Sequence, residues 1–226
     1  MNIKLIACGS TKWDRLIRNW GISFLINEDV LFDTFGKPQV LLNNIKEKNI
    51  DISKIKHIII SHEHWDHTSG LWDILTLNNK VIVYVCSHTD NTIKERITSC
   101  GVTLKEIDSA CKITENIYTT GELSKDGNLY EQCVYIKTEK GIVLVTGCAH
   151  PGIIKIIKKT KQESGDNIYA VIGGLHLKDS TIKDIENVVS ELKKMNINFF
   201  VPLHCTGKIA VDLFKSNLNC ISLEEI

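Results

Sequence analysis

The stretch Ser61-His62-Glu63-His64-Trp65-Asp66-His67 decides how the chain is interpreted, because it places three histidines and an aspartate within six residues. It directly follows Ile58-Ile59-Ile60, a short β-branched run that predicts a buried strand ending where the polar side chains begin. Side chains alternate along an extended backbone. His62 and His64 are therefore expected to project to one side, while Asp66 and His67 turn off the strand end.

This density of ligand-type side chains points to metal. Imidazole nitrogen and carboxylate oxygen are ligands that zinc, manganese and iron accept. Removing several such groups from water together is costly unless a cation compensates them. The motif therefore predicts a metalloprotein.

The composition narrows the class of protein. The chain has 226 residues, 43% of them hydrophobic, with 27 basic and 27 acidic side chains. A formal charge of zero gives no basic footprint for nucleic acid and no reason to expect an acidic-membrane partner. No apolar stretch reaches membrane-spanning length, and residues 1–19 lack the long apolar segment of a secretion signal. A cytoplasmic location is the resulting expectation.

The eight cysteines are scattered and form no CxxC pair, which argues against a zinc ribbon or a thioredoxin-type site. In a cytoplasmic chain they are expected to be reduced and mostly buried, where they act as small apolar side chains. Cys148 and Cys205 are exceptions of interest, because each adjoins a candidate site histidine.

The chain shows no repeat, linker or low-complexity tract, so a single domain over residues 1–226 is predicted. Short apolar runs predict strands over residues 3–7, 23–26, 30–32, 58–60 and 81–85, with helices over 38–48 and 91–99. A hairpin is expected over 134–146. Helices over 151–163 and 181–195 then alternate with strands over 168–172 and 199–201.

Each late strand ends in a turn that carries a histidine: His150, His176 and His204. Adjacent strands of one sheet would bring these turns together at a common edge, where the first motif is also expected. The repeated pattern of glycine or proline followed by histidine supports a shared site.

These residues resemble a known family. His62-x-His64-x-Asp66-His67 after a strand looks like the metal signature of the metallo-β-lactamase fold. Together with TGCAHPGI at 146–153, GGLHL at 173–177 and PLHCTG at 202–207, it is similar to the group typified by 7,8-dihydropterin-6-ylmethyl-4-(β-D-ribofuranosyl)aminobenzene 5′-phosphate synthases. The resemblance implies an α/β (α+β) fold, a four-layer αββα sandwich of two mixed β-sheets flanked by helices, with metals at one edge.

The resemblance also implies the ligands: His62 and His64 for one metal, Asp66, His67 and His204 for the second, and His150 as a further ligand. His150 would occupy either a third-histidine position or the place of a bridging aspartate. That aspartate is not evident, because Cys148 stands where many members have Gly-Asp. Cys148 could ligate as a thiolate or be a buried thiol beside the site.

Other residues carry weaker expectations. Asp33 matches a carboxylate that orients a metal-binding histidine, the alternative being an exposed aspartate in a turn. His176 could bind metal, contact a substrate phosphate, act as a general acid or be structural. Residues 155–161 are lysine-rich and form either a solvated helix face or a weak attraction for a phosphorylated substrate. His57 and His88 are not expected to bind metal.

The main functional prediction is a metal-dependent hydrolase that uses metal-activated water on a phosphoester, lactone or thioester, with Asp66 and His176 as catalytic residues. The alternative implied by the resemblance is a transferase that condenses a dihydropterin-methyl diphosphate with an arylamine ribose phosphate in methanopterin-type cofactor synthesis. A diiron redox protein and a non-catalytic metal protein are disfavoured. The expected cofactor is one or two Zn²⁺ ions, with Mn²⁺ or Fe²⁺ as alternatives. The expected partner is a small-molecule substrate, either phosphorylated or not, and a homodimer stays open.

Overall fold

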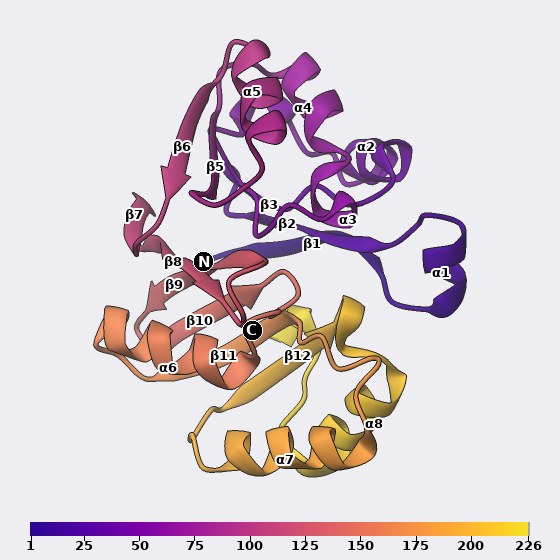
Figure 1. Ribbon diagram of the computed structural model, residues 1–226, viewed down its shortest axis with the longest axis vertical. Helices are drawn as coiled ribbons and strands as arrows, with labels where there is room; N and C mark the ends of the chain where they lie inside the picture. Colours follow the sequence, from indigo (N-terminus) through magenta and orange to yellow (C-terminus); the bar gives the residue numbers. More distant parts are fainter. Residues whose placement is uncertain (226) are drawn as a thin grey trace. The chain divides into compact units, whose positions relative to one another are not determined.

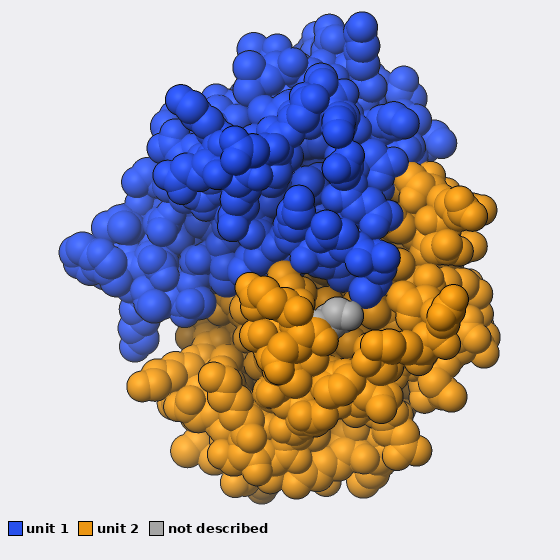
Figure 2. All heavy atoms as spheres, turned by 180° about the vertical axis from the view of Figure 1, so that it is seen from behind, with its two compact units in different colours: residues 1–108 blue, residues 109–226 orange. Residues whose placement is uncertain are grey.

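The computed structural model describes residues 1–225. The chain divides into two compact units, residues 1–108 and a second unit that begins at Ser109 (Figure 2). Each unit contains one six-stranded sheet and its own hydrophobic core. The interpretation of the whole chain as one domain stays a prediction.

The sheet of the first unit has the strand order β1-β2-β3-β4-β5-β6 (Figure 1). Its strands are β1 (Ile3–Gly9), β2 (Gly21–Ile26), β3 (Val30–Phe32), β4 (His57–Ile59), β5 (Ile82–Cys86) and β6 (Thr103–Ile107). The pairings β1–β2 and β2–β3 are antiparallel, and those from β3 to β6 are parallel. The site motif follows β4, a central strand of this sheet.

The helices of the first unit are α1 (Lys12–Leu16), α2 (Pro38–Glu47), α3 (Trp65–Thr68), α4 (Leu71–Leu77) and α5 (Asn91–Ser99), with a 3₁₀ turn η1 (Ile52–Lys54). The apolar faces of α2, α4 and α5 pack against alternate strand residues such as Leu31, Ile58 and Val83. Proline at the start of α2 suits the first helical turn, because its missing N–H has no intrahelical partner there. This core fixes the loop after β4 from one side of the sheet.

The sheet of the second unit has the order β12-β11-β10-β9-β8-β7. Its strands are β7 (Cys111–Thr114), β8 (Ile117–Ser124), β9 (Tyr130–Thr138), β10 (Gly141–Thr146), β11 (Ile168–Gly174) and β12 (Phe199–Leu203). The strands from β7 to β10 are antiparallel, whereas β10, β11 and β12 are parallel. The carboxyl ends of the last three strands therefore lie at the same edge.

Three helices cover the second sheet: α6 (Ile153–Ser164), α7 (Ile182–Lys193) and α8 (Lys208–Asn217), with 3₁₀ turns η2 (His204–Thr206) and η3 (Leu223–Glu225). Helix α6 buries Ile153, Ile156 and Ile157, whose spacing of three and four residues produces one apolar face. It ends at Gly165, which adopts a left-handed conformation (φ 73°) and donates its N–H to the Lys161 carbonyl. The buried face of α6 packs into the core of the second unit.

The predicted fold class is confirmed: both sheets are mixed and carry helices. The predicted strand over residues 58–60 ends one residue early, at Ile59, and the helix predicted from residue 151 begins at Ile153. Among the residues that the structure describes, no helix is long and apolar enough to cross a membrane.

Candidate metal centre and active site

The loop after β4 brings His62 and His64 together. Nε2 of His62 lies 3.0 Å from Nδ1 of His64, and the two rings meet edge to face with centroids 4.6 Å apart. Zinc binds imidazole nitrogen at about 2.0–2.1 Å, so two nitrogens at this separation can share one ion. The prediction that these side chains project to the same side is confirmed.

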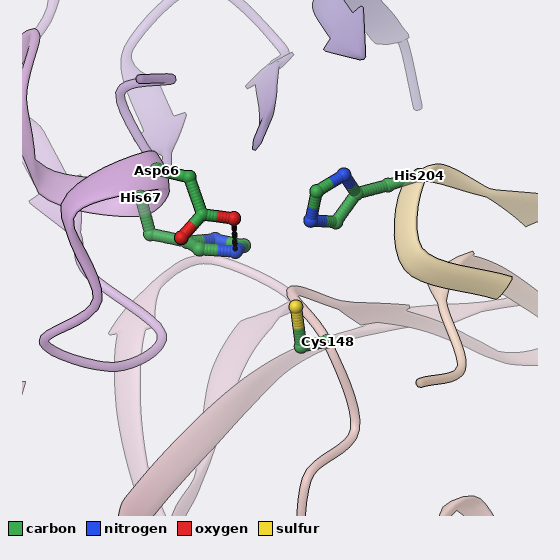
Figure 3. Close-up of side chains that lie close together, drawn as sticks. All are labelled: Asp66, His67, Cys148 and His204. Atoms are coloured by element: carbon green, nitrogen blue, oxygen red, sulfur yellow. Dashed lines mark ion pairs between the residues drawn. The ribbon is translucent and has the colours of Figure 1, made fainter. Parts of the chain in front are cut away.

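Helix α3 holds the next two predicted ligands. Its first turn is closed by the N–H of His67, which donates to the carbonyl of His64 at 3.0 Å. Both Asp66 and His67 are buried, and Oδ2 of Asp66 lies 3.4 Å from Nε2 of His67 (Figure 3). A carboxylate oxygen and an imidazole nitrogen thus form a second ligand pair within the first unit.

Asp33 orients His67. Its Oδ2 lies 2.6 Å from Nδ1 of His67, and its two oxygens accept hydrogen bonds of 2.7 Å from the backbone N–H and the hydroxyl of Ser61. With Nδ1 engaged in this way, Nε2 is the nitrogen of His67 that can coordinate metal. Burial opposes protonation of His67, but the Asp33 and Asp66 carboxylates outweigh it and raise the pKa of His67 well above its usual value.

The second unit collects its site residues at the carboxyl ends of β10, β11 and β12. Ala149, His176 and His204, one in each of the three turns, have positive φ angles of 61°, 51° and 47°. Left-handed backbone at residues other than glycine is strained and gathers at functional sites. The rings of His150 and His176 lie 4.0 Å apart.

Cys148 lies among these histidines. Its sulfur is within 4.8 Å of a ring nitrogen of His150, of His176 and of His204, and Figure 3 shows it with the imidazole of His204. Thiolate is a good zinc ligand. Cys148 therefore qualifies chemically as a ligand in this unit.

The buried thiol of Cys205 contacts residues of the same cluster. Its sulfur accepts the N–H of His176 at 3.3 Å and lies 3.6 Å from the Cys148 carbonyl. Burial opposes ionisation of this thiol, but hydrogen bonding with Cys148 and the imidazoles of His204 and His176 lower the pKa of Cys205 well below its usual value. In return, the interaction with Cys205 raises the pKa of His176.

Glu131 is a supporting residue of the site to which the sequence assigned no role, although Glu131-Gln132 matches part of an acidic segment in the resembling group. This fully buried carboxylate on β9 accepts the backbone N–H groups of Cys148, Ala149 and His150 at 2.9, 2.8 and 2.7 Å. It shapes the loop that presents two candidate ligands. Its place among apolar strand residues also distinguishes it in the sequence, because a buried charge there needs several donors.

A cavity of about 820 Å³ opens beside His150 and His176, and all of its lining residues belong to the second unit. Its basic lining residues are Lys125, Lys155 and Lys158. Two further histidines lie outside these groups: His57 contacts the Tyr84 hydroxyl at 3.0 Å, and His88 belongs to no group of candidate metal ligands in the described chain.

Comparisons with known proteins identify the family to which this chain is similar. A family model of the metallo-beta-lactamase superfamily matches residues 23–99. A 7,8-dihydropterin-6-methyl-4-(beta-D-ribofuranosyl)-aminobenzene-5′-phosphate synthase of Methanocaldococcus jannaschii is 33% identical over 86% of this chain and 83% of its own. An uncharacterized protein of the same organism is 28% identical over 89% and 90%.

Among solved structures, the metal-dependent hydrolase Tm1679 of the beta-lactamase superfamily is similar with a TM-score of 0.77 and 28% identity, over 97% of this chain and 94% of that one. The chain belongs to the metallo-β-lactamase superfamily and is an enzyme of that class. Within the superfamily it falls in the group similar to the dihydropterin-linked synthase, as its motifs predicted.

The residues present fit the metal ions that this fold implies. Both units offer buried imidazole nitrogens beside a carboxylate or a thiol, and one imidazole is already oriented by a buried carboxylate. This donor set suits a borderline metal such as zinc or iron.

Proposed function

We propose that the protein is a metal-dependent transferase that joins a dihydropterin-methyl diphosphate to an arylamine ribose phosphate. A C–N bond forms between the amine and the methylene carbon, the C–O bond to the diphosphate breaks, and pyrophosphate and a proton leave. The observation that carries this proposal is the 33% identity to the Methanocaldococcus jannaschii synthase over more than four fifths of both chains.

The proposed ligands are the residues that the sequence indicated: His62, His64, Asp66, His67, His150 and His204. Zn²⁺, as one or two ions, is the proposed metal, because these nitrogen and oxygen donors and the nearby Cys148 match its preferences. When bound, the metal supplies positive charge that stabilises a departing diphosphate or activates water in a hydrolytic reaction.

Side chains of the protein are proposed to carry out the proton transfers. His176 is exposed at the cavity, and its interaction with Cys205 raises its pKa. A protonated imidazole there can donate to the leaving diphosphate, and its neutral form can accept the amine proton. Asp66 is buried beside His67 and is proposed to orient the reacting groups through its second carboxylate oxygen.

A second candidate is hydrolysis of a phosphoester, lactone or thioester. The similarity to Tm1679, which is described as a metal-dependent hydrolase, favours this alternative. Both reactions use the same ligands, so substrate recognition outside the ligand set decides between them.

The test uses the metal-reconstituted full chain with both transferase substrates, and mass spectrometry detects the condensed product and pyrophosphate. A panel of phosphodiester, lactone and thioester substrates runs in parallel. His62→Ala should reduce the true activity to background, whereas His57→Ala, a histidine outside the ligand groups, should retain it. Hydrolysis without condensation would contradict the transferase proposal, and elemental analysis of the same sample identifies the metal.

A further inference from the structure

The cavity of the second unit has two kinds of wall. Lys125 comes from the segment between β8 and β9, and Lys155 and Lys158 come from the first two turns of α6. The apolar wall consists of Ile153, Ile154, Leu175, Leu177 and Val188. A volume of about 820 Å³ is within the range of small-molecule sites.

The three lysines of this cavity are not engaged in ion pairs with any residue that the structure describes, although Asp126 interacts electrostatically with Lys125 and Glu191 with Lys158. Among the described residues, no acidic side chain forms an ion pair with Lys125, Lys155 or Lys158, in contrast to Lys159, which pairs with Glu163 at 2.5 Å. Asp184 is the acidic residue of the lining, so the cavity carries a net positive charge. Such a cavity attracts an anion.

A hydrogen bond fixes the arrangement of the lysines. Nζ of Lys155 donates to the Ser124 carbonyl at 2.6 Å, which ties the start of the β8–β9 segment to α6. Lys125, which follows Ser124 in the chain, is thereby held at the wall of the same cavity as Lys155. The amino terminus of α6 adds a smaller contribution, because no side chain caps it and its first turn contains no acidic residue.

The lining also contains His150 and His176, the candidate ligand and catalytic residues of this unit. We propose that this cavity binds the arylamine substrate, with Lys125, Lys155 and Lys158 holding its phosphate monoester and the apolar wall contacting its aromatic ring. This inference rests on the proposed transferase function. The diphosphate of the other substrate is the leaving group and belongs with the metal ions, whereas the phosphate ester does not react and can be held by lysines.

The test measures binding rather than turnover. Titration calorimetry of the metal-loaded full chain compares ribose 5-phosphate, ribose and pyrophosphate. Ribose 5-phosphate should bind at least about tenfold more tightly than ribose, and the difference should shrink with added salt because the contacts are charged. Lys125→Ala/Lys158→Ala should weaken ribose 5-phosphate about tenfold or more, since each charged hydrogen bond contributes substantially.

Lys161→Ala is the matched control, because it removes a charge from the same helix but does not line the cavity. It should change the affinity less than about twofold. Equal binding of ribose and ribose 5-phosphate, or loss of pyrophosphate binding alone in the double variant, would overturn the assignment. These results are independent of catalysis, so a chain that binds ribose 5-phosphate through the lysines but forms no condensed product would refute the transferase proposal and not the phosphate site.

Discussion

Oδ2 of Asp33 lies 2.6 Å from Nδ1 of His67, and neither side chain is exposed to solvent. The carboxylate comes from the residue that follows β3 and the imidazole from α3, so their contact connects two segments that are distant in the chain. Asp33 also accepts both hydrogen bonds from Ser61. Its role can therefore be separated experimentally from that of the ligands.

Asp33→Asn should weaken metal binding about 10–100-fold, because the neutral amide no longer fixes the orientation of His67 or raises its basicity. Chelator competition followed by elemental analysis measures the affinity. Asp212→Asn, an exposed aspartate on α8, is the control and should bind metal as the unaltered chain does. Equal affinities in the two variants would refute the orienting role.

Metal binding should release a proton from His67 at neutral pH. In the metal-free protein the two neighbouring carboxylates raise the pKa of His67 well above its usual value, which favours the protonated imidazole, and that proton must leave before the ring nitrogen coordinates metal. Affinity should therefore increase as the pH rises towards that pKa. Calorimetry in buffers of different ionisation enthalpy counts the protons, and Asp33→Asn should release fewer. No buffer dependence would contradict the expectation.

Glu131→Gln should destabilise the second unit. An amide oxygen replaces a carboxylate that accepts three backbone N–H groups, which leaves at least one buried donor without its partner. The expected loss is about 1–3 kcal/mol, or roughly 2–4 °C per kcal/mol for a chain of this size. Thermal unfolding measures it against Glu186→Gln on the exposed side of α7. Identical midpoints would show that the three bonds contribute little.

Gly174→Ala should also destabilise the fold. A Cβ atom there would lie 2.3 Å from the Gly147 carbonyl oxygen and 2.7 Å from the Cys205 sulfur, and that carbonyl is backbone in the turn directly after β10. Overpacking of this kind costs about 1–3 kcal/mol. Gly127→Ala is the control: nothing lies near its Cβ, so only its positive φ penalises it, by about 1–2 kcal/mol. Denaturant unfolding should place Gly174→Ala below this control, and the reverse order would argue against the clash.

The sequence was informative where apolar runs are short and clearly bounded. The buried strands β2, β3, β5, β10 and β11 were predicted to within two residues at each end, because burial on both faces gives them continuous aliphatic runs. Strands β6 and β7 were not predicted. They are edge strands with mostly exposed or half-buried side chains, so their pattern resembles that of a loop.

Strand β8 was missed for a different reason. Gly121 lies in its middle with φ 72°, and the pairing register with β9 shifts there, so the alternation of side chains is interrupted. Helix α3 has only four residues and consists largely of ligand-type side chains. A helix of this length is too short for the 3.6-residue periodicity to be recognised in the sequence.

The candidate ligands were predictable because histidine and aspartate at fixed spacing have few other uses, and the structure brings them together within each unit as described for His62 with His64 and Asp66 with His67. The residues that support the ligands were harder to predict from the sequence. Glu131 is 17 residues from Cys148 in sequence, and nothing in the local pattern shows that its carboxylate faces that loop.

Ala149, His176 and His204 adopt left-handed backbone angles, each in a turn after a parallel strand. Each such angle costs an L-amino acid about 1–2 kcal/mol, which the strands behind the turns must offset. The conformation of the histidine turns therefore depends on the rigidity of the sheet that carries them. If these loops were grafted onto a less rigid sheet, their backbone would relax to unstrained angles. The imidazoles would then move apart, even though the loop sequences were unchanged.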